Sequence, residues 1–292
     1  MPKKYSMFWG CTILTRLPYV EAATRKVTDN LGIEIEDVAG ASCCPEPYTI
    51  GLVGRDLRAA LGARNIAIAE EIGLEMTTLC NGCYDTFCEV KEMLNDDKKL
   101  LKKVNRVMRQ TGMKYSGNLP IRHFVEVLHE DVGLKRLKNR IKRRMNNLQV
   151  AVHSGCHIRK SEKVEDVEKK SQMLEEIVQT TGVEVVDYGL EKMCCGYPHR
   201  QADETLSLKE TLATKLNSIL KRDADCIITV CSGCNVQFEF GQMELKQRYQ
   251  MSYKLPILNL TELLALSMGF SPQNIGLDRH RISTNPVIEK VV

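Results

Sequence analysis

The feature that most constrains this chain is a set of five cysteines that occurs twice. Each set has a lone cysteine, then an adjacent Cys-Cys pair, then a Cys-x-x-Cys motif. In both sets 35 residues separate the pair from the motif (45–79 and 196–230). The first set is Cys11, Cys43, Cys44, Cys80 and Cys83, and the second is Cys156, Cys194, Cys195, Cys231 and Cys234. Such a repeat predicts two copies of one structural unit.

The residues around the cysteines repeat as well. The segment GIEIED at 32–37 matches GVEVVD at 182–187, and a glycine precedes each lone cysteine. A chain of 292 residues is long enough for two domains with separate cores. We therefore expect a first cysteine-rich domain at residues 1–134, a basic linker at 135–147 and a second cysteine-rich domain at 148–292.

The periodicity of apolar residues predicts an α/β fold in both halves. Short apolar runs that end near cysteines predict strands at Tyr5–Trp9, Gln149–Val152 and Ile227–Val230. Helical patterns occur at Glu21–Leu31, Asp166–Thr180 and Leu206–Leu220, and a basic helical insertion occurs in the first copy at Lys98–Arg109. Strands that alternate with helices favour parallel sheets, with the metal sites at strand ends.

The sequence also indicates where in the cell the protein is found. Residues 1–11 contain no apolar signal core, and no stretch approaches the ~18 apolar residues of a membrane span. A net charge of +4 gives little support for nucleic-acid binding. We expect a cytoplasmic protein, where reducing conditions keep the twelve cysteines free for metal binding or redox chemistry.

Five thiolates per copy favour an iron–sulfur cluster over zinc. A structural zinc ion takes four ligands, usually as two separated pairs. Two adjacent cysteines cannot comfortably join three others on one tetrahedral ion, but they can reach different irons of an extended cluster. Thioredoxin-like exchange at each Cys-x-x-Cys is an alternative, although it leaves three repeated cysteines per copy without a role.

Two cysteines fall outside the repeat. Cys226 forms a plant-type [2Fe–2S] spacing with Cys231 and Cys234, but its counterpart in the first copy is Glu75. Cys88 corresponds to Glu239 in the second copy. We therefore interpret Cys226 and Cys88 as thiols without a ligand role.

The complete pattern resembles the cysteine-rich CCG domain, which occurs in tandem in the B subunit of heterodisulfide reductase. The second copy matches it as Cys194-Cys195-Gly196, whereas the first has Pro45 in place of the glycine. The resemblance implies that each set of five cysteines binds one noncubane [4Fe–4S] cluster. It also implies an oxidoreductase that cleaves the CoM-S-S-CoB heterodisulfide between the two clusters, with the ferredoxin-type C subunit and the flavin-containing A subunit as partners.

Side chains close in sequence to the cysteines of the second set suggest further roles in that reaction. His153 and His157 flank Cys156, and either could deliver a proton to a departing thiolate. Arg159, Lys160 and Arg200 could attract the sulfonate and phosphate groups of the substrate.

Two other functions stay open at this point. The same cysteine domain occurs in subunits of lactate, glycolate and quinone-linked oxidoreductases. The chain could also be an electron-transfer module that has no substrate site.

Overall fold

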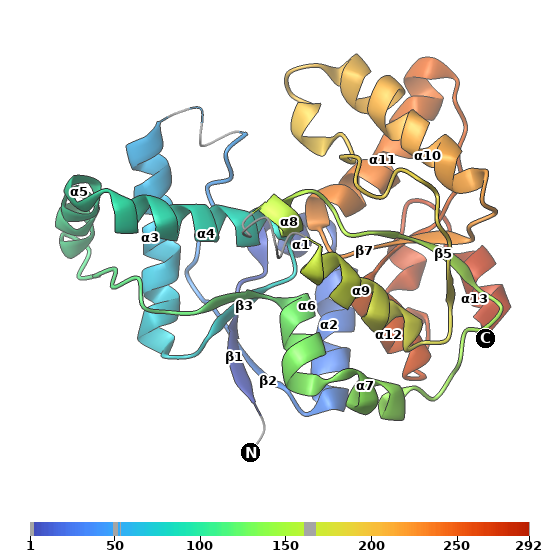
Figure 1. Ribbon diagram of the computed structural model, residues 1–292, viewed down its shortest axis with the longest axis horizontal. Coiled ribbons are helices and arrows are strands. Elements are labelled where there is room, and N and C mark those ends of the chain that lie inside the picture. Colours follow the sequence, from blue (N-terminus) through green and yellow to red (C-terminus); the bar gives the residue numbers. More distant parts are fainter. Residues whose placement is uncertain (1–2, 49–51, 53, 161–167, 292) are drawn as a thin grey trace.

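The computed structural model describes residues 3–48, 52, 54–160 and 168–291, with only the backbone of residues 159 and 160. Two four-stranded sheets form its framework, and all of their paired strands are parallel (Figure 1). The first contains β1 (Lys4–Met7), β2 (Glu34–Asp37), β3 (Met76–Thr78) and β4 (Ile121–His123). The second contains β5 (Gln149–His153), β6 (Glu184–Val185), β7 (Cys226–Thr229) and β8 (Ile257–Asn259). The orders β2-β1-β3-β4 and β6-β5-β7-β8 are the same, which confirms the predicted α/β fold and its internal repeat.

Helices connect the strands in both halves. The first half contains α1 (Gly10–Arg16), α2 (Pro18–Leu31), α3 (Arg55–Ile72), α4 (Asn81–Asp96), α5 (Lys98–Arg109), α6 (Phe124–Glu126) and α7 (Leu134–Arg140). The second contains α8 (His157–Lys160), α9 (Lys169–Gln179), α10 (Ala213–Leu220), α11 (Ser232–Tyr249), α12 (Leu260–Ser267) and α13 (Asn285–Val291). Residues 166 and 167 of one predicted helix lie outside the described part of the chain. A π-helical segment at Leu206–Leu212 leads into α10 and completes the helix predicted for residues 206–220.

The basic insertion of the first half forms the predicted helix, α5. The Asp97 side chain accepts hydrogen bonds from the backbone N–H groups of Lys99 and Leu100, which fixes where the helix begins. Leu100, Val104 and Met108 recur at helical spacing and are buried, so the lysines and arginines occupy the outer face.

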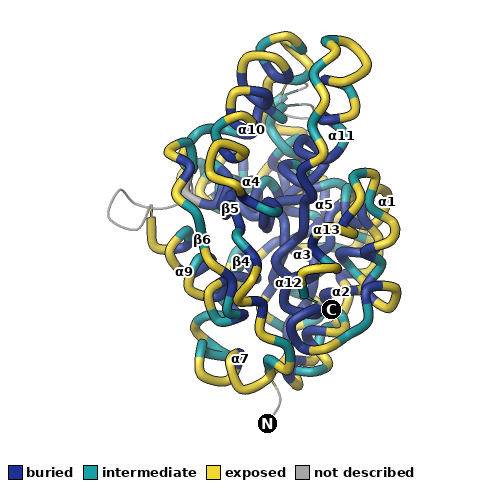
Figure 2. The backbone as a smooth tube through the Cα atoms, turned by 90° about the vertical axis from the view of Figure 1, so that its right-hand side faces the viewer, coloured by how far each residue is buried: buried dark blue, intermediate teal, exposed yellow. Residues whose placement is uncertain are grey.

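The two halves share their hydrophobic core, since each of two buried apolar clusters contains residues from both. Helix α2 of the first half packs on α12 of the second, where Thr24 Oγ1 donates to Thr261 Oγ1 at 3.0 Å. Helix α6 packs on α9 across the same boundary. Figure 2 shows α12 buried along its length, whereas the outer turns of α7 are exposed. Burial of apolar side chains from both halves therefore fixes one sheet relative to the other.

A buried ionic cluster joins the C-terminal segment to this core. The His280 imidazole lies between two carboxylates, with Nε2 2.8 Å from Glu262 Oε1 and Nδ1 3.5 Å from Glu239 Oε1. The Tyr19 hydroxyl donates to Glu239 Oε2 at 2.9 Å. Burial opposes the charged imidazole, but the two carboxylates outweigh it and raise the pKa of His280 to about 10.

Candidate metal centre

All ten repeated cysteines lie beyond the carboxyl ends of parallel strands. The lone cysteines follow β1 and β5, the Cys-Cys pairs follow β2 and β6, and the Cys-x-x-Cys motifs follow β3 and β7. Carboxyl ends of parallel strands lie at the same edge of a sheet, which is where α/β proteins usually bind ligands. The strand order thus brings three distant segments of each half together.

Each Cys-x-x-Cys motif begins a long helix. Cys80 is the N-cap of α4 and Cys231 is the N-cap of α11. Their backbone N–H groups donate to Thr78 Oγ1 and Thr229 Oγ1, each at 3.3 Å. The positive end of a helix favours thiolate over thiol, so both motifs are suited to metal binding.

The ten thiols form one continuous row in which each thiol shifts the pKa of the next, and the two at one end, Cys156 and Cys194, are hydrogen-bonded at 4.0 Å. Its order is Cys11, Cys43, Cys44, Cys83, Cys80, Cys231, Cys234, Cys195, Cys194 and Cys156. The row reads the same from either end, because each set contributes its lone cysteine, its pair and its motif in turn. The two sets meet in the middle, at Cys80 and Cys231.

A cavity of about 250 Å³ lies along this row of thiols. Every cysteine of the two sets except Cys194 lines it, together with Tyr48, His157 and Tyr197. Contacts between the halves close its base, where Ser232 Oγ donates to Cys80 Sγ at 3.1 Å and Asn81 Nδ2 donates to the Ser154 carbonyl at 2.6 Å. Both cysteine sets therefore face one cavity.

Glycines beside the cysteines leave no room for a side chain. A Cβ atom on Gly10 would lie 2.9 Å from Cys83 Sγ, and one on Gly196 would lie 2.6 Å from the Ser207 carbonyl oxygen. Both residues also have positive φ angles, +75° and +95°, which favour glycine. The glycine of the Cys-Cys-Gly motif is thus required by the backbone and by the close packing around it.

His157 belongs to a hydrogen-bonded chain that reaches the cavity. Its Nδ1 lies 2.5 Å from Asp85 Oδ2, and its Nε2 lies 2.8 Å from the Tyr48 hydroxyl. Asp85 is 1% exposed. At the matching positions the other set has Thr12, Val236 and His199 instead, and a valine side chain cannot form a hydrogen bond. Asp85 and Tyr48 were not among the predicted site residues, because the hydrogen-bonded chain joins segments from both halves.

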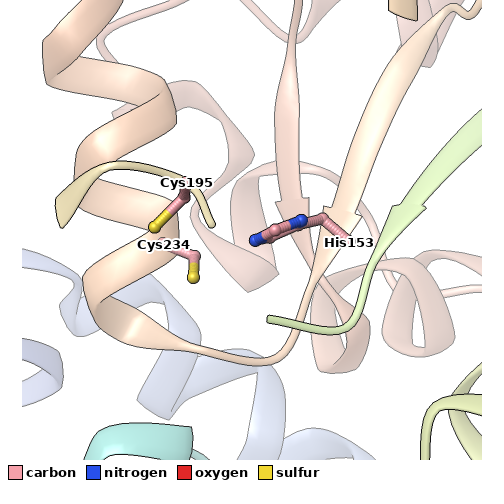
Figure 3. Close-up of side chains that lie close together, drawn as sticks. All are labelled: His153, Cys195 and Cys234. Carbon is pink, nitrogen blue, oxygen red and sulfur yellow. The ribbon is translucent and has the colours of Figure 1, made fainter. Parts of the chain in front are cut away.

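His153 lies behind the second set and is not among the residues that line the cavity. Figure 3 shows its ring pointing toward the side chains of Cys195 and Cys234. The three ligand atoms lie within 4.8 Å of one another, so His153 is a further possible ligand. Its Nδ1 is 3.3 Å from Nζ of the buried Lys215. Burial lowers the pKa of Lys215 to about 8, against the opposing effect of the Cys195 and Cys234 charges.

A second, polar cleft shares Glu46, Tyr48, Tyr197 and Pro198 with the cysteine-lined cavity. The guanidinium groups of Arg16, Arg200 and Arg248 line it, and Arg200 forms an ion pair with Glu244. Arg200 thus lies near the cavity, and its role in attracting an anionic substrate stays a prediction. The side chains of Arg159 and Lys160 lie outside the described part of the structure.

The same cysteine arrangement defines a known family. The CCG profile, described as a cysteine-rich domain, matches residues 5–87 and 150–239. The chain belongs to the CCG family. It is 33% identical over 292 residues to the B subunit of the ferredoxin/F420H2-dependent CoB-CoM heterodisulfide reductase of Methanosarcina acetivorans, covering 99% of this chain and 97% of the relative. This similarity confirms the predicted resemblance to the B subunit of heterodisulfide reductase.

Other CCG proteins resemble the chain over its length. The 8-methylmenaquinol:fumarate reductase membrane anchor subunit of Wolinella succinogenes is 27% identical, covering 97% of this chain and 98% of the relative. A crystal structure of a hypothetical protein from Helicobacter pylori has a TM-score of 0.80 at 16% identity, and the match covers 97% of this chain but 53% of that one. It supports the fold. None of the described helices is both long and apolar enough to cross a membrane.

The donor set of this CCG protein suits an iron–sulfur group. Hydrogen bonds from neighbouring cysteines lower the pKa of Cys44 to about 6 and that of Cys194 to about 2, so each set contains a thiol poised to ionise. Thiolates are the usual ligands of iron–sulfur clusters. Cysteine neighbours and burial raise the pKa of most other thiols in the row. Burial also raises the pKa of Cys226 and that of Cys88, neither of which has a cysteine neighbour among the causes of its shift.

Cys226 and Cys88 are both separate from the row of thiols and from the cavity lining. Cys226 begins β7, whereas Cys231 follows the opposite end of that strand. Five extended residues at ~3.3 Å each place their Cα atoms about 16 Å apart. The two therefore cannot bind one small cluster, which removes the plant-type [2Fe–2S] alternative.

Proposed function

We propose that the chain is the disulfide-cleaving subunit of a heterodisulfide reductase. Each set of five cysteines would hold one noncubane [4Fe–4S] cluster, in halves at residues 1–134 and 148–292 that residues 135–147 join. The observation that carries the proposal is the single cavity lined by nine of the ten repeated cysteines, five from the first set and four from the second. A substrate with two bonded sulfur atoms matches two similar sites that meet in the middle.

The reaction requires two electrons and two protons for each disulfide that becomes two thiols. When bound, the clusters would supply the electrons, because iron–sulfur clusters usually transfer one each. The chain's own residues have three tasks: to bind the disulfide in the cavity, to exclude water from it and to deliver protons. The base of the cavity is closed by buried contacts, and its lining combines the thiols with polar side chains such as those of Tyr48, Asn81 and His157.

Proton delivery is assigned to His157, acting through Tyr48. Burial and the negative charges of Cys156 and Cys194 raise the pKa of Tyr48, so its hydroxyl stays protonated. When His157 is an imidazolium, its Nε2–H donates to the Tyr48 oxygen and the tyrosine O–H is free to face the cavity. The Tyr48 proton passes to a thiolate product while His157 replaces it, and Asp85 holds the Nδ1–H throughout. His153 lies behind the cysteines and is not used here.

The proposed setting follows the family resemblance. A ferredoxin-type C subunit would deliver electrons and a flavin-containing A subunit would supply them, in the cytoplasm. The substrate would be the CoM-S-S-CoB heterodisulfide, with Arg200 near the path of its anionic groups.

Iron and sulfide analysis of the full chain, purified without oxygen, tests the proposal. About eight irons per chain are expected for two four-iron clusters. The EPR spectrum of the oxidised protein should change when coenzyme M or coenzyme B is added as the free thiol. Zinc without sulfide would contradict the proposal.

A second candidate is a CCG subunit of a lactate, glycolate or quinone-linked oxidoreductase, or a plain electron carrier. The full-length similarity to the Wolinella succinogenes relative favours keeping this candidate. Clusters whose spectrum is indifferent to every thiol, in a complex that does not reduce the disulfide, would support it over the first.

A further inference from the structure

The two cysteine sets follow equivalent strands of two sheets with the same strand order, but different charges lie behind them. In the second half, the ring of His153 packs edge-on against Phe238 at 5.0 Å. In the first half, Phe8 occupies the matching position and packs edge-on against Phe87 at 4.7 Å. An apolar ring in one half thus corresponds to a polar ring in the other.

The helix that covers each sheet near these rings shows the same difference. In the first half, α3 packs the alanines Ala59, Ala63 and Ala67 into the same apolar cluster as Phe8 and Phe87. In the second half the matching helix, α10, contributes Lys215, which is 0% exposed. Lys215 follows Leu208 and Leu212 at helical spacing, so it interrupts an apolar stripe. A buried ammonium group is costly unless it is compensated, so its position calls for an explanation.

The surroundings of Lys215 compensate it only in part. Its Nζ donates to the Leu190 carbonyl at 2.6 Å, lies 3.3 Å from His153 Nδ1 and sits 5.4 Å from the centre of the Tyr188 ring. Among the described residues, no carboxylate lies within ion-pair distance of it. The negative groups that act on it most are the sulfur atoms of Cys195, Cys234 and Cys194, ahead of Glu191. Its charge therefore faces the second cysteine set.

Within the described part of the chain, the cations near the first set are paired or partly exposed. At the position of α3 that matches Lys215, Arg64 is only partly buried and donates to the Gly40 carbonyl at 3.0 Å. Lys170 is 4% exposed and lies 4.9 Å from the centre of the Tyr84 ring, but it forms an ion pair with Glu126 at 3.7 Å.

Arg58 approaches the loop of the first set and donates to the Pro45 carbonyl at 3.2 Å, but its guanidinium is paired with Glu89. His123 lies near Cys80, yet burial lowers its pKa to about 3 and keeps it neutral. Among the described residues, a fully buried cation without a carboxylate partner thus lies behind the second set and not behind the first.

We propose that Lys215 makes the second cluster the stronger electron acceptor of the pair. The inference rests on the proposed function, because it requires a cluster in each set. Reduction adds one negative charge to a cluster, and a fixed positive charge in a buried environment stabilises that state. Lys215 does not line the cavity and does not touch the substrate. It acts on the potential of the second cluster through His153 and the sulfur atoms.

A redox titration of the full chain, followed by EPR with a chemical reductant as electron source, tests this inference. The wild-type chain should show two separate midpoint potentials. Cys156→Ser should remove or alter the more positive one, which assigns it to the second set. Lys215→Met should make that midpoint more negative. The equilibrium constant for reduction should fall at least tenfold, which corresponds to about 59 mV for one electron. Lys215→Arg retains the charge and should move the midpoint much less.

Several results would overturn the inference without touching the proposed function. One is a single shared midpoint in the wild-type chain, and another is loss of the more negative midpoint in Cys156→Ser. A third is a Lys215→Met variant in which neither midpoint moves, or in which both midpoints move by the same amount. If Lys215→Met does not assemble its clusters, two measurements still test the inference. They are the separation of the two midpoint potentials in the wild-type chain and the assignment of the more positive one by Cys156→Ser. A chain without iron and sulfide would instead refute the proposed function.

Discussion

Replacement of Gly10 by alanine should prevent assembly of the first cluster and spare the second. The added Cβ would lie 2.9 Å from Cys83 Sγ, closer than real Cβ atoms approach other heavy atoms. Ordinary contact begins at ~3.5 Å, so the sulfur must withdraw by about 0.6 Å. Metal sites tolerate errors of roughly 0.2 Å in ligand distance. The displacement is therefore about three times what a ligand sulfur can accommodate.

Backbone strain must be separated from this contact. Gly10 has φ +75°, and alanine there costs roughly 1–2 kcal/mol whatever its neighbours are. Gly40 provides the matched control, because it has φ +77° and no atom within 4 Å of its added Cβ. Gly40→Ala should lose a similar amount of stability while keeping all of its iron.

Iron and sulfide per chain, measured side by side for the two variants, give the result. Gly10→Ala should fall from about eight irons toward about four, and Gly40→Ala should stay at about eight. The urea midpoints of the metal-free chains should fall by comparable amounts. Equal iron and sulfide in both variants would refute the argument that Cys83 is held at its ligand position by the absence of a side chain on Gly10.

Three further predictions concern other parts of the molecule. The contribution of His280 to the free energy of unfolding should be fully present below pH 6.5, where His280 is charged in both the folded and the unfolded state. It should fall by an amount on the order of a few kcal/mol as the pH rises through about 10. Urea titrations at several pH values should show this loss in the wild-type chain and not in His280→Gln. Tyr48→Phe should lower disulfide turnover by ~10²-fold or more with unchanged cluster content, whereas Tyr253→Phe, which loses a hydroxyl bonded to a surface asparagine, should turn over normally in the same assay. Cys226→Ala should retain full iron content and Cys231→Ala should lose iron, and equal losses would show that position on β7 does not distinguish ligand from core thiol.

The local elements of the fold were predictable from the sequence because their signals are local. The strand before Cys156, the helix at Lys98–Arg109 and the repeat of five cysteines each depend on residues close together in the chain. The strand order then places the cysteines at one edge of each sheet. These features required only hydrophobic periodicity and the repeat.

The contacts between the halves could not be predicted in this way. Asp85, His157 and Tyr48 come from α4, α8 and the loop after Cys44, and no spacing rule joins them. Lys215 did leave a signal, since it stands in the apolar stripe of residues 206–220, where burial of a lysine is unusual. Polar residues on an otherwise apolar helix face are therefore the positions to inspect first in related chains.

The shared core has a consequence for the chemistry that two independent domains would not provide. Two sites that act on the two atoms of one bond must stay at a fixed separation, since a shift of about 1 Å can cost 10²-fold in rate. Here α2 packs on α12 and α6 on α9, so the sheets that hold the two cysteine sets cannot move apart without opening that core. Within this rigid frame the differences between the repeats concern charge: the Tyr48 chain and Lys215 both act on the second set. The geometry is thus symmetric enough for two sulfur atoms, while the electrostatics differ enough to give the two sites different roles.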